Sequence, residues 1–384
     1  MKKEFQVRVR ATTLRHSAQS PLRLFLIARR CRLTRISPMD WSALPPELLH
    51  LISTKFSSIS DLINFRSVCN TWRASASVSH LPPQIPCFLL QPNPGATTLQ
   101  FYSLTSGKTH TVSVPTCRDQ TVLDSSNGYL LMRHLENHDL SLLNPVNNSE
   151  VSLPFLRIRE PKLVWACLDP VQTDDYVVCI FGNASTPSKL SAFWRPGEVN
   201  WTIINKGSRK SCYYKGMYLD LATISKSLAI YDVATQTLRD AVLPPRSEGT
   251  FSPSAVVAHL VVSADQVFRV LQHDSKYLPM HWCHFEIHRL EFGTDKKKPF
   301  WVKVSNIGDQ ILFLNLVNGF SISASCFEEV RGNFIYFMRE WDTGFDNLNS
   351  YVLARYDIEA GTAEVLPFPP VTCGRWFLPS LWYA

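Results

Sequence analysis

A strand–turn–strand unit that ends on proline recurs through the C-terminal three-quarters of this chain, and it constrains the fold more than any other feature. In each copy an apolar or aromatic run meets a turn of Gly, Asn, Asp or Thr, and a second run closes on Pro. The clearest copies are Gln100–Pro115, Leu140–Pro154, Leu228–Pro244 and Tyr351–Pro367. Because such a hairpin cannot cover its own apolar face, neighbouring units must stack on it.

Stacked hairpins at intervals of tens of residues are typical of a β-propeller. About 290 residues, at roughly 40–50 residues for each four-stranded blade, predict six or seven blades. The proline stops are unevenly spaced, so diverged units must lie around residues 165–182 and 256–292. A two-sheet sandwich of hairpins is the alternative that this pattern leaves open.

A helical pattern precedes the β region. Pro45 and Pro46 suit the start of a helix, because their fixed φ fits the first turn, and Glu47 adds negative charge near the helix N-terminus. Apolar residues then follow at helical spacing, first in Leu48, Leu49, Leu51, Ile52 and Phe56 and then in Leu62, Phe65, Cys69 and Trp72. Helices that total only about 40 residues cannot bury all of this surface against each other. We therefore expect a groove on another protein to cover the surplus.

Three fragments of this helical segment resemble an F-box in order and spacing. They are Leu44-Pro45-Pro46-Glu47-Leu48-Leu49, Leu62-Ile63-Asn64-Phe65-Arg66 and Val68-Cys69-Asn70-Thr71-Trp72-Arg73. F-boxes dock substrate receptors onto Skp-type adaptors of cullin-RING ubiquitin ligases. The resemblance implies that one group of residues faces the adaptor, namely Leu44, Pro45, Leu48, Leu49 and Ile52. It implies that a second group completes the interface and the module's own core, namely Leu62, Phe65, Val68, Cys69 and Trp72.

A second resemblance covers roughly residues 90–375. Residues 210–220, 301–314 and 332–337 are similar to the C-terminal domain of the plant F-box proteins known as the DUF295 family. That family joins an F-box to a Kelch-like β domain. The resemblance implies an α+β multidomain protein, with a short N-terminal helical F-box followed by an all-β, propeller-like (Kelch-like) domain.

These patterns predict four segments: a basic, disordered extension (1–38), an F-box (40–80), a Pro-rich linker (81–90) and the β domain (91–384). Of 39 Lys/Arg and 32 Asp/Glu residues, the extension holds ten and one, which leaves 29 basic and 31 acidic residues in the body. The chain outside the extension therefore lacks the excess of positive charge that binding to a nucleic-acid backbone requires. The extension also has the composition of an organellar transit peptide, and translation could instead start at Met39.

Composition and motif content narrow the function further. No apolar run reaches the roughly 18–20 residues of a membrane span. The ten cysteines include no CxxC pair, which suits reduced thiols in the cytoplasm or nucleus. The usual nucleotide-binding and nucleophile motifs are missing. We expect a non-catalytic substrate receptor of an SCF-type (Skp-cullin-F-box) ligase, whose β domain binds a protein target. The alternative is a ligase-independent organellar β-domain protein with a transit peptide.

Two further segments contain candidate binding residues. The 341–349 loop holds Trp341 and Phe345, which are suited to contact a protein target. The 281–288 segment holds three His and one Cys. If 285–292 is a strand, His284, Glu286 and His288 share one face and Cys283 faces the other way. Without a second ligand cluster in the sequence, we expect a polar strand face there, with no metal and no other cofactor.

Overall fold

The computed structural model divides after Pro82 into a helical unit, Met1–Pro82, and a β unit, Pro83–Ala384. It describes residues 41, 44–56, 59–77, 85–90, 95–104, 106–146, 148–166, 176–183, 189–204, 210–222, 227–235, 237–243, 256–263, 265–274, 283–293, 298–315, 319–327, 330–341, 350–367 and 374–377. The predicted extension, residues 1–38, lies outside these ranges. The predicted linker, residues 81–90, extends too far, because residues 87–90 form strand β1 (Cys87–Leu90).

The described part of the helical unit contains the helices α2 (Pro46–Ser53), α3 (Ile59–Arg66) and α4 (Asn70–Ser75). Helix α2 begins where the two prolines predict, with Pro45 as its N-cap and Glu47 in its first turn. The fixed φ of Pro45, −55° here, suits that position. Within the described ranges, no helix combines the length and the apolar character needed to cross a bilayer.

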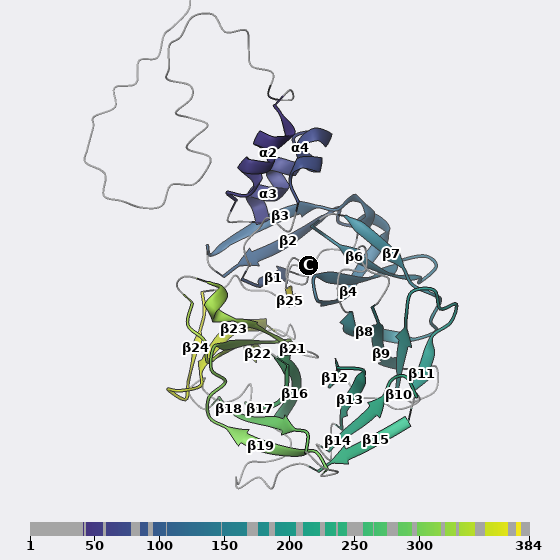
Figure 1. Ribbon diagram of the computed structural model, residues 1–384, viewed down its shortest axis with the longest axis vertical. Coiled ribbons are helices and arrows are strands. Elements are labelled where there is room, and N and C mark those ends of the chain that lie inside the picture. The colour runs from purple at the N-terminus through teal and green to yellow at the C-terminus, as the bar shows by residue number, and fades with distance from the viewer. Residues whose placement is uncertain are drawn as a thin grey trace, which may run out of the picture. The chain divides into compact units, whose positions relative to one another are not determined.

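The β unit consists of six sheets in its described residues, and Figure 1 shows them arranged around a common centre. The first three sheets contain β1 with β2 (Thr98–Ser103), β3 (Lys108–Ser113) and β25 (Gly374–Phe377); β4 (Gln120–Ser126), β5 (Tyr129–His134), β6 (Leu140–Asn144) and β7 (Ser149–Ser152); and β8 (Arg159–Ala166), β9 (Val178–Asn183), β10 (Lys189–Trp194) and β11 (Thr202–Ile204). The last three contain β12 (Ser211–Tyr214), β13 (Met217–Leu221), β14 (Leu228–Asp232) and β15 (Thr237–Val242); β16 (Val256–Ser263), β17 (Gln266–His273), β18 (His284–Glu291) and β19 (Phe300–Val304); and β20 (Gln310–Leu314), β21 (Gly319–Ser323), β22 (Phe334–Trp341), β23 (Ser350–Asp357) and β24 (Thr362–Val365).

The four hairpins predicted from the sequence are confirmed. They are the antiparallel pairs β2–β3, β6–β7, β14–β15 and β23–β24. Each pair forms one end of its sheet in the strand order, and the diverged regions around 165–182 and 256–292 supply strands of the third and fifth sheets. The fold is a six-bladed propeller, so the alternative of a two-sheet sandwich is wrong.

Apolar clusters fill the space between each pair of neighbouring sheets, which is why a single hairpin could not stand alone. One cluster joins the second and third sheets through Leu142 and Ile180, and another joins the fourth and fifth through Leu219 and Leu260. Four more clusters lie between the remaining neighbours around the ring. Strands such as β6, whose residues are all buried, are therefore covered on both faces.

The C-terminal strand closes the ring. Strand β25 pairs antiparallel with β1, so the two ends of the β unit share one sheet. Trp376, only 1% exposed, packs against Phe88 of that sheet and Phe313 of the sixth. Its backbone N–H donates to Asn315 Oδ1 at 2.7 Å, and its carbonyl accepts from Ser125 Oγ at 2.8 Å. Strand β25 is thus the edge strand of the first sheet opposite β3 and completes that blade to four strands.

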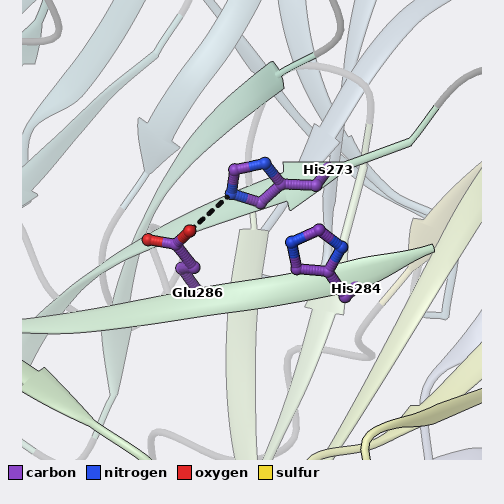
Figure 2. Close-up of side chains that lie close together, drawn as sticks. All are labelled: His273, His284 and Glu286. Carbon is purple, nitrogen blue, oxygen red and sulfur yellow. Dashed lines mark ion pairs between the residues drawn. The ribbon is translucent and has the colours of Figure 1, made fainter. Parts of the chain in front are cut away.

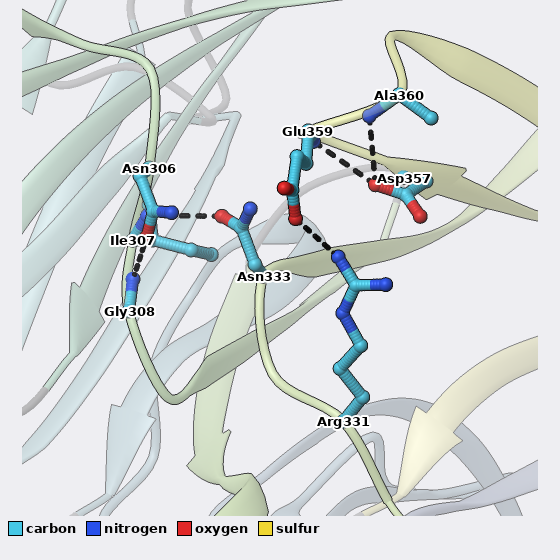
Figure 3. A network of polar contacts seen from close by, with 8 residues as sticks. All are labelled: Asn306, Ile307, Gly308, Arg331, Asn333, Asp357, Glu359 and Ala360. Carbon is cyan, nitrogen blue, oxygen red and sulfur yellow. Dashed lines mark hydrogen bonds and ion pairs between the residues drawn. The ribbon is translucent and has the colours of Figure 1, made fainter.

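A polar network at one corner of the sixth sheet connects two of the segments that resemble the DUF295 family, residues 301–314 and 332–337 (Figure 3). Asn333, with φ of 68°, accepts the backbone N–H of Ile307 on its side-chain oxygen at 3.0 Å. A Cβ on the preceding Gly332 would lie 2.6–2.7 Å from backbone atoms of Asp309, so only glycine fits this close approach. The 301–314 and 332–337 segments thus have a structural role in joining β19, β20 and β22.

Candidate docking site of the helical unit

A small core holds the three helices together. Leu49 of α2 and Leu62 of α3 are both 0% exposed. Phe65 lies between Phe56 and Trp72, with ring centroids 5.1 Å and 4.4 Å apart. The Trp72 indole N–H donates to the carbonyl of Trp41 at 3.0 Å. These side chains are occupied by the module itself and are not available to a partner.

Two arginines of the resembling fragments link α3 to α4. The Arg66 guanidinium donates to the carbonyls of Arg73 and Ala76, and Arg73 Nε donates to the carbonyl of Arg66 at 3.2 Å. Burial, followed by the proximity of Arg73, lowers the pKa of the Arg66 guanidinium. The sequence analysis gave Arg66 and Arg73 no role. Each directly follows an aromatic core residue, Phe65 or Trp72, and that position could have indicated that they link the two helices.

Four large apolar side chains among the described residues of this unit are exposed. Trp41 is 44% exposed, Leu48 and Leu51 on α2 are 48% and 57% exposed, and Val68, which follows α3, is 55% exposed. The described side chains of the module leave them open, and exposed apolar groups gathered on one small unit are typical of an interaction site. Leu51 was part of the predicted helical stripe but was not among the predicted interface residues.

Leu51 lies in a groove between α2 and α4. The groove is lined by Pro46, Glu47, His50, Leu51, Thr71, Ala74, Ser75 and Ser77. Its two walls come from residues about 20–30 positions apart in the chain, so only the packing of α2 against α4 creates it. The lining combines apolar residues such as Leu51 and Ala74 with polar residues such as Glu47 and Thr71, a mixture suited to a protein partner.

The predicted interface residues therefore separate into two groups. Leu49, Leu62, Phe65 and Trp72 form the core, Pro45, Leu48 and Val68 are exposed, and Leu44, Ile52 and Cys69 are half-buried. The expectation that Leu49 faces the adaptor is wrong, because its side chain is fully buried in the core. The exposed and half-buried residues, together with Leu51, are the ones that a partner could reach.

The predicted target-contact residues lie in the β unit. Trp341 is the last residue of β22, where it pairs with Ser350 in the sheet. Its side chain and the whole of Phe345 fall outside the described part of the chain. Their role as target contacts stays a prediction.

The combination of a short helical module with a six-bladed propeller defines a class of two-part proteins, and comparison with known families agrees with it. Residues 41–82 match the F-box domain, and residues 101–362 match the KIB1-4 beta-propeller family. The second match covers more than half of the chain. The protein belongs to the KIB1-4 beta-propeller family and carries an F-box domain ahead of its propeller.

Individual proteins are similar to the whole chain or to parts of it. The chain is 25% identical over 390 residues to the F-box/kelch-repeat protein At5g24040 of Arabidopsis thaliana, covering 86% of this chain and 98% of the relative. It is 50% identical over 50 residues to F-box protein SKIP23 of the same plant, covering 12% of each chain. Among solved structures, TolB from Acinetobacter baumannii aligns with a TM-score of 0.43 at 10% identity, covering 81% of this chain and 71% of that one.

Proposed function

We propose that this protein is a substrate-recognition subunit of an SCF-type ubiquitin ligase. The helical unit binds a Skp-type adaptor and through it a cullin-RING ligase. The β unit holds a protein target within reach of the ubiquitin-charged enzyme. In this role the chain has no catalytic centre, because its contribution to the reaction is to position the target.

The observation that carries the proposal is the exposure of Leu48, Leu51 and Val68 beside a core that is already complete. These three side chains have no structural task within the module, and their burial on a partner would supply the hydrophobic free energy of docking. The F-box match over residues 41–82 supports a Skp-type adaptor as that partner.

The propeller supports the second half of the proposal. Its blades are held by apolar clusters on both faces, so the connecting loops are free to vary without loss of the fold. Trp341 at the end of β22 and Phe345 are the proposed target contacts. We further propose that the family resemblance extends to the DUF295 F-box proteins and that the protein acts in the cytoplasm or nucleus.

The test is a binding measurement between the full chain and a purified Skp-type adaptor. The variant pair Leu48→Arg and Val68→Arg places charges on the exposed apolar positions, and we expect it to abolish co-purification. Leu238→Arg is the matched control, because Leu238 on β15 is 56% exposed but lies in the propeller. If the double variant binds the adaptor as well as wild type does, the proposed docking face is refuted.

A further inference from the structure

Two histidines and a glutamate meet on one face of the fifth propeller sheet. His273 ends β17 and pairs in register with His284, which begins β18. Glu286 stands two residues further along β18, so its side chain emerges on the same face as that of His284. One possible ligand atom from each of the three residues lies within 4.8 Å of the others. Figure 2 shows the two rings facing each other, with the carboxylate reaching towards His273.

The distances are close to those of a metal coordination shell. His273 Nε2 lies 3.1 Å from Glu286 Oε1, and the two imidazole rings are stacked with centroids 4.3 Å apart. With metal–ligand bonds of about 2.0–2.2 Å, ligand atoms in a tetrahedral shell are roughly 3.4 Å apart. Stacked rings direct their nitrogen lone pairs in parallel, so one imidazole must turn about its side-chain torsions before both rings can bind one ion. The paired strands keep the backbone positions of His273 and His284 opposite each other during that turn.

Charges of both signs surround the cluster. The negative charge for a cation comes from Glu286, whose side chain is 21% exposed. Lys303 on β19 and Arg269 on β17 are the opposing positive charges nearby.

An ion pair between His273 and Glu286 accounts for the contact of these two residues alone. A divalent cation would be bound by three side chains, because His284 lies opposite His273 in the sheet register and its ligand atom is as close to the other two.

We propose that His273, His284 and Glu286 bind a divalent first-row transition metal ion of the Zn²⁺ type, with solvent completing the coordination. Two imidazoles and a carboxylate are a recognised donor set for such ions and a poor one for Mg²⁺ or Ca²⁺. This proposal departs from the sequence-based expectation of a metal-free polar strand face. His273 was not singled out there, because it lies on a different strand from His284.

The neighbouring thiol is not a ligand in this proposal. Cys283 is 1% exposed and packs into the apolar cluster between the fifth and sixth sheets. The site also does not depend on adaptor docking, because all three residues belong to the β unit.

The test is a Zn²⁺ titration of the full chain after chelator treatment, followed by calorimetry. We expect the wild-type chain to bind one equivalent of Zn²⁺ at His273, His284 and Glu286. The variants His273→Ala, His284→Ala and Glu286→Gln should each weaken that binding at least tenfold. His110→Ala, which removes a half-buried histidine from β3 in another blade, and Cys283→Ser should leave it unchanged. Mg²⁺ should give no comparable signal.

A second measurement separates loss of the site from loss of the fold. The thermal melting temperature of the wild-type chain should rise when Zn²⁺ is added, because a ligand of the native state stabilises it. Glu286→Gln, which keeps the size of the side chain, should melt as wild type does without metal and lose the rise with metal. Equal Zn²⁺ affinity in wild type and all three variants, or loss of binding in Cys283→Ser alone, would overturn the proposal.

Discussion

Adjacent leucines of α2 offer a sharp test of the docking site, because Leu48 is 48% exposed and Leu49 is 0% exposed. Full burial of a leucine side chain contributes about 1.5–3 kcal/mol. Covering the exposed parts of Leu48 and Leu51, at 48% and 57%, would therefore contribute roughly 1–1.5 kcal/mol each. Alanine keeps part of that area, so we expect the double variant Leu48→Ala, Leu51→Ala to lose about 1.5–2.5 kcal/mol of binding, a roughly 10- to 70-fold rise in Kd for the adaptor.

Leu49→Ala serves as the comparison. Truncating a leucine in a core costs about 2–5 kcal/mol of stability, and a unit of three short helices has little stability to spare. We expect Leu49→Ala to lose hydrogen-exchange protection throughout α2, α3 and α4, whereas the Leu48, Leu51 double variant keeps that protection.

The assay is biolayer interferometry with the purified adaptor, together with hydrogen exchange of the free chain. A Kd for the double variant within twofold of wild type would refute the assignment of Leu48 and Leu51 to the interface. Loss of exchange protection in the double variant would refute it in another way, because those leucines would then belong to the module's core.

Three further predictions concern the propeller. Trp376→Ala should lower the free energy of unfolding by about 3–5 kcal/mol, because it removes the packing of β25 in the first sheet. Leu243→Ala, at a residue 79% exposed, should change that free energy little. Equal thermal shifts of the two variants would argue against closure of the ring through β25. Gly332→Ala should lower the melting temperature markedly, because its Cβ would meet the backbone of Asp309; a wild-type melt would show that the corner yields. Burial, then Lys210, holds the pKa of His259 well below its usual range, so stability present above the unfolded-state pKa of about 6.5 is lost as pH falls below it. His259→Phe should therefore flatten the pH dependence of the free energy of unfolding, measured by denaturant titration between pH 7 and 5, by up to about 1.4 kcal/mol per pH unit. An unchanged slope would mean that His259 does not titrate.

Local sequence patterns predicted much of this architecture. Proline stops and polar turns located four hairpins, because a turn of a few residues decides where two adjacent strands pair. The two prolines before Glu47 located the start of α2 within a residue. The order and spacing of three helical fragments indicated the F-box, which the family comparison confirms.

Local patterns could not separate the two sides of α2. Leu48 and Leu49 are both leucines within one helical turn, and the F-box resemblance assigned both to the adaptor face. Only the packing of α3 and α4, with Leu62 and Phe65 covering Leu49, decides which of them is buried. The Arg66 and Arg73 contacts to backbone carbonyls depend on that packing too.

The amino-acid order by itself thus determined the kinds of unit in this protein, since helix starts, turns and strand alternation depend on neighbours within a few positions. The tertiary structure decided which distant residues meet. Strand β25 reaches β1 across nearly the whole β unit, and His273 stands opposite His284 only because of the register between β17 and β18. Such contacts depend on the cooperative closure of six sheets around one ring, and no local pattern specifies them.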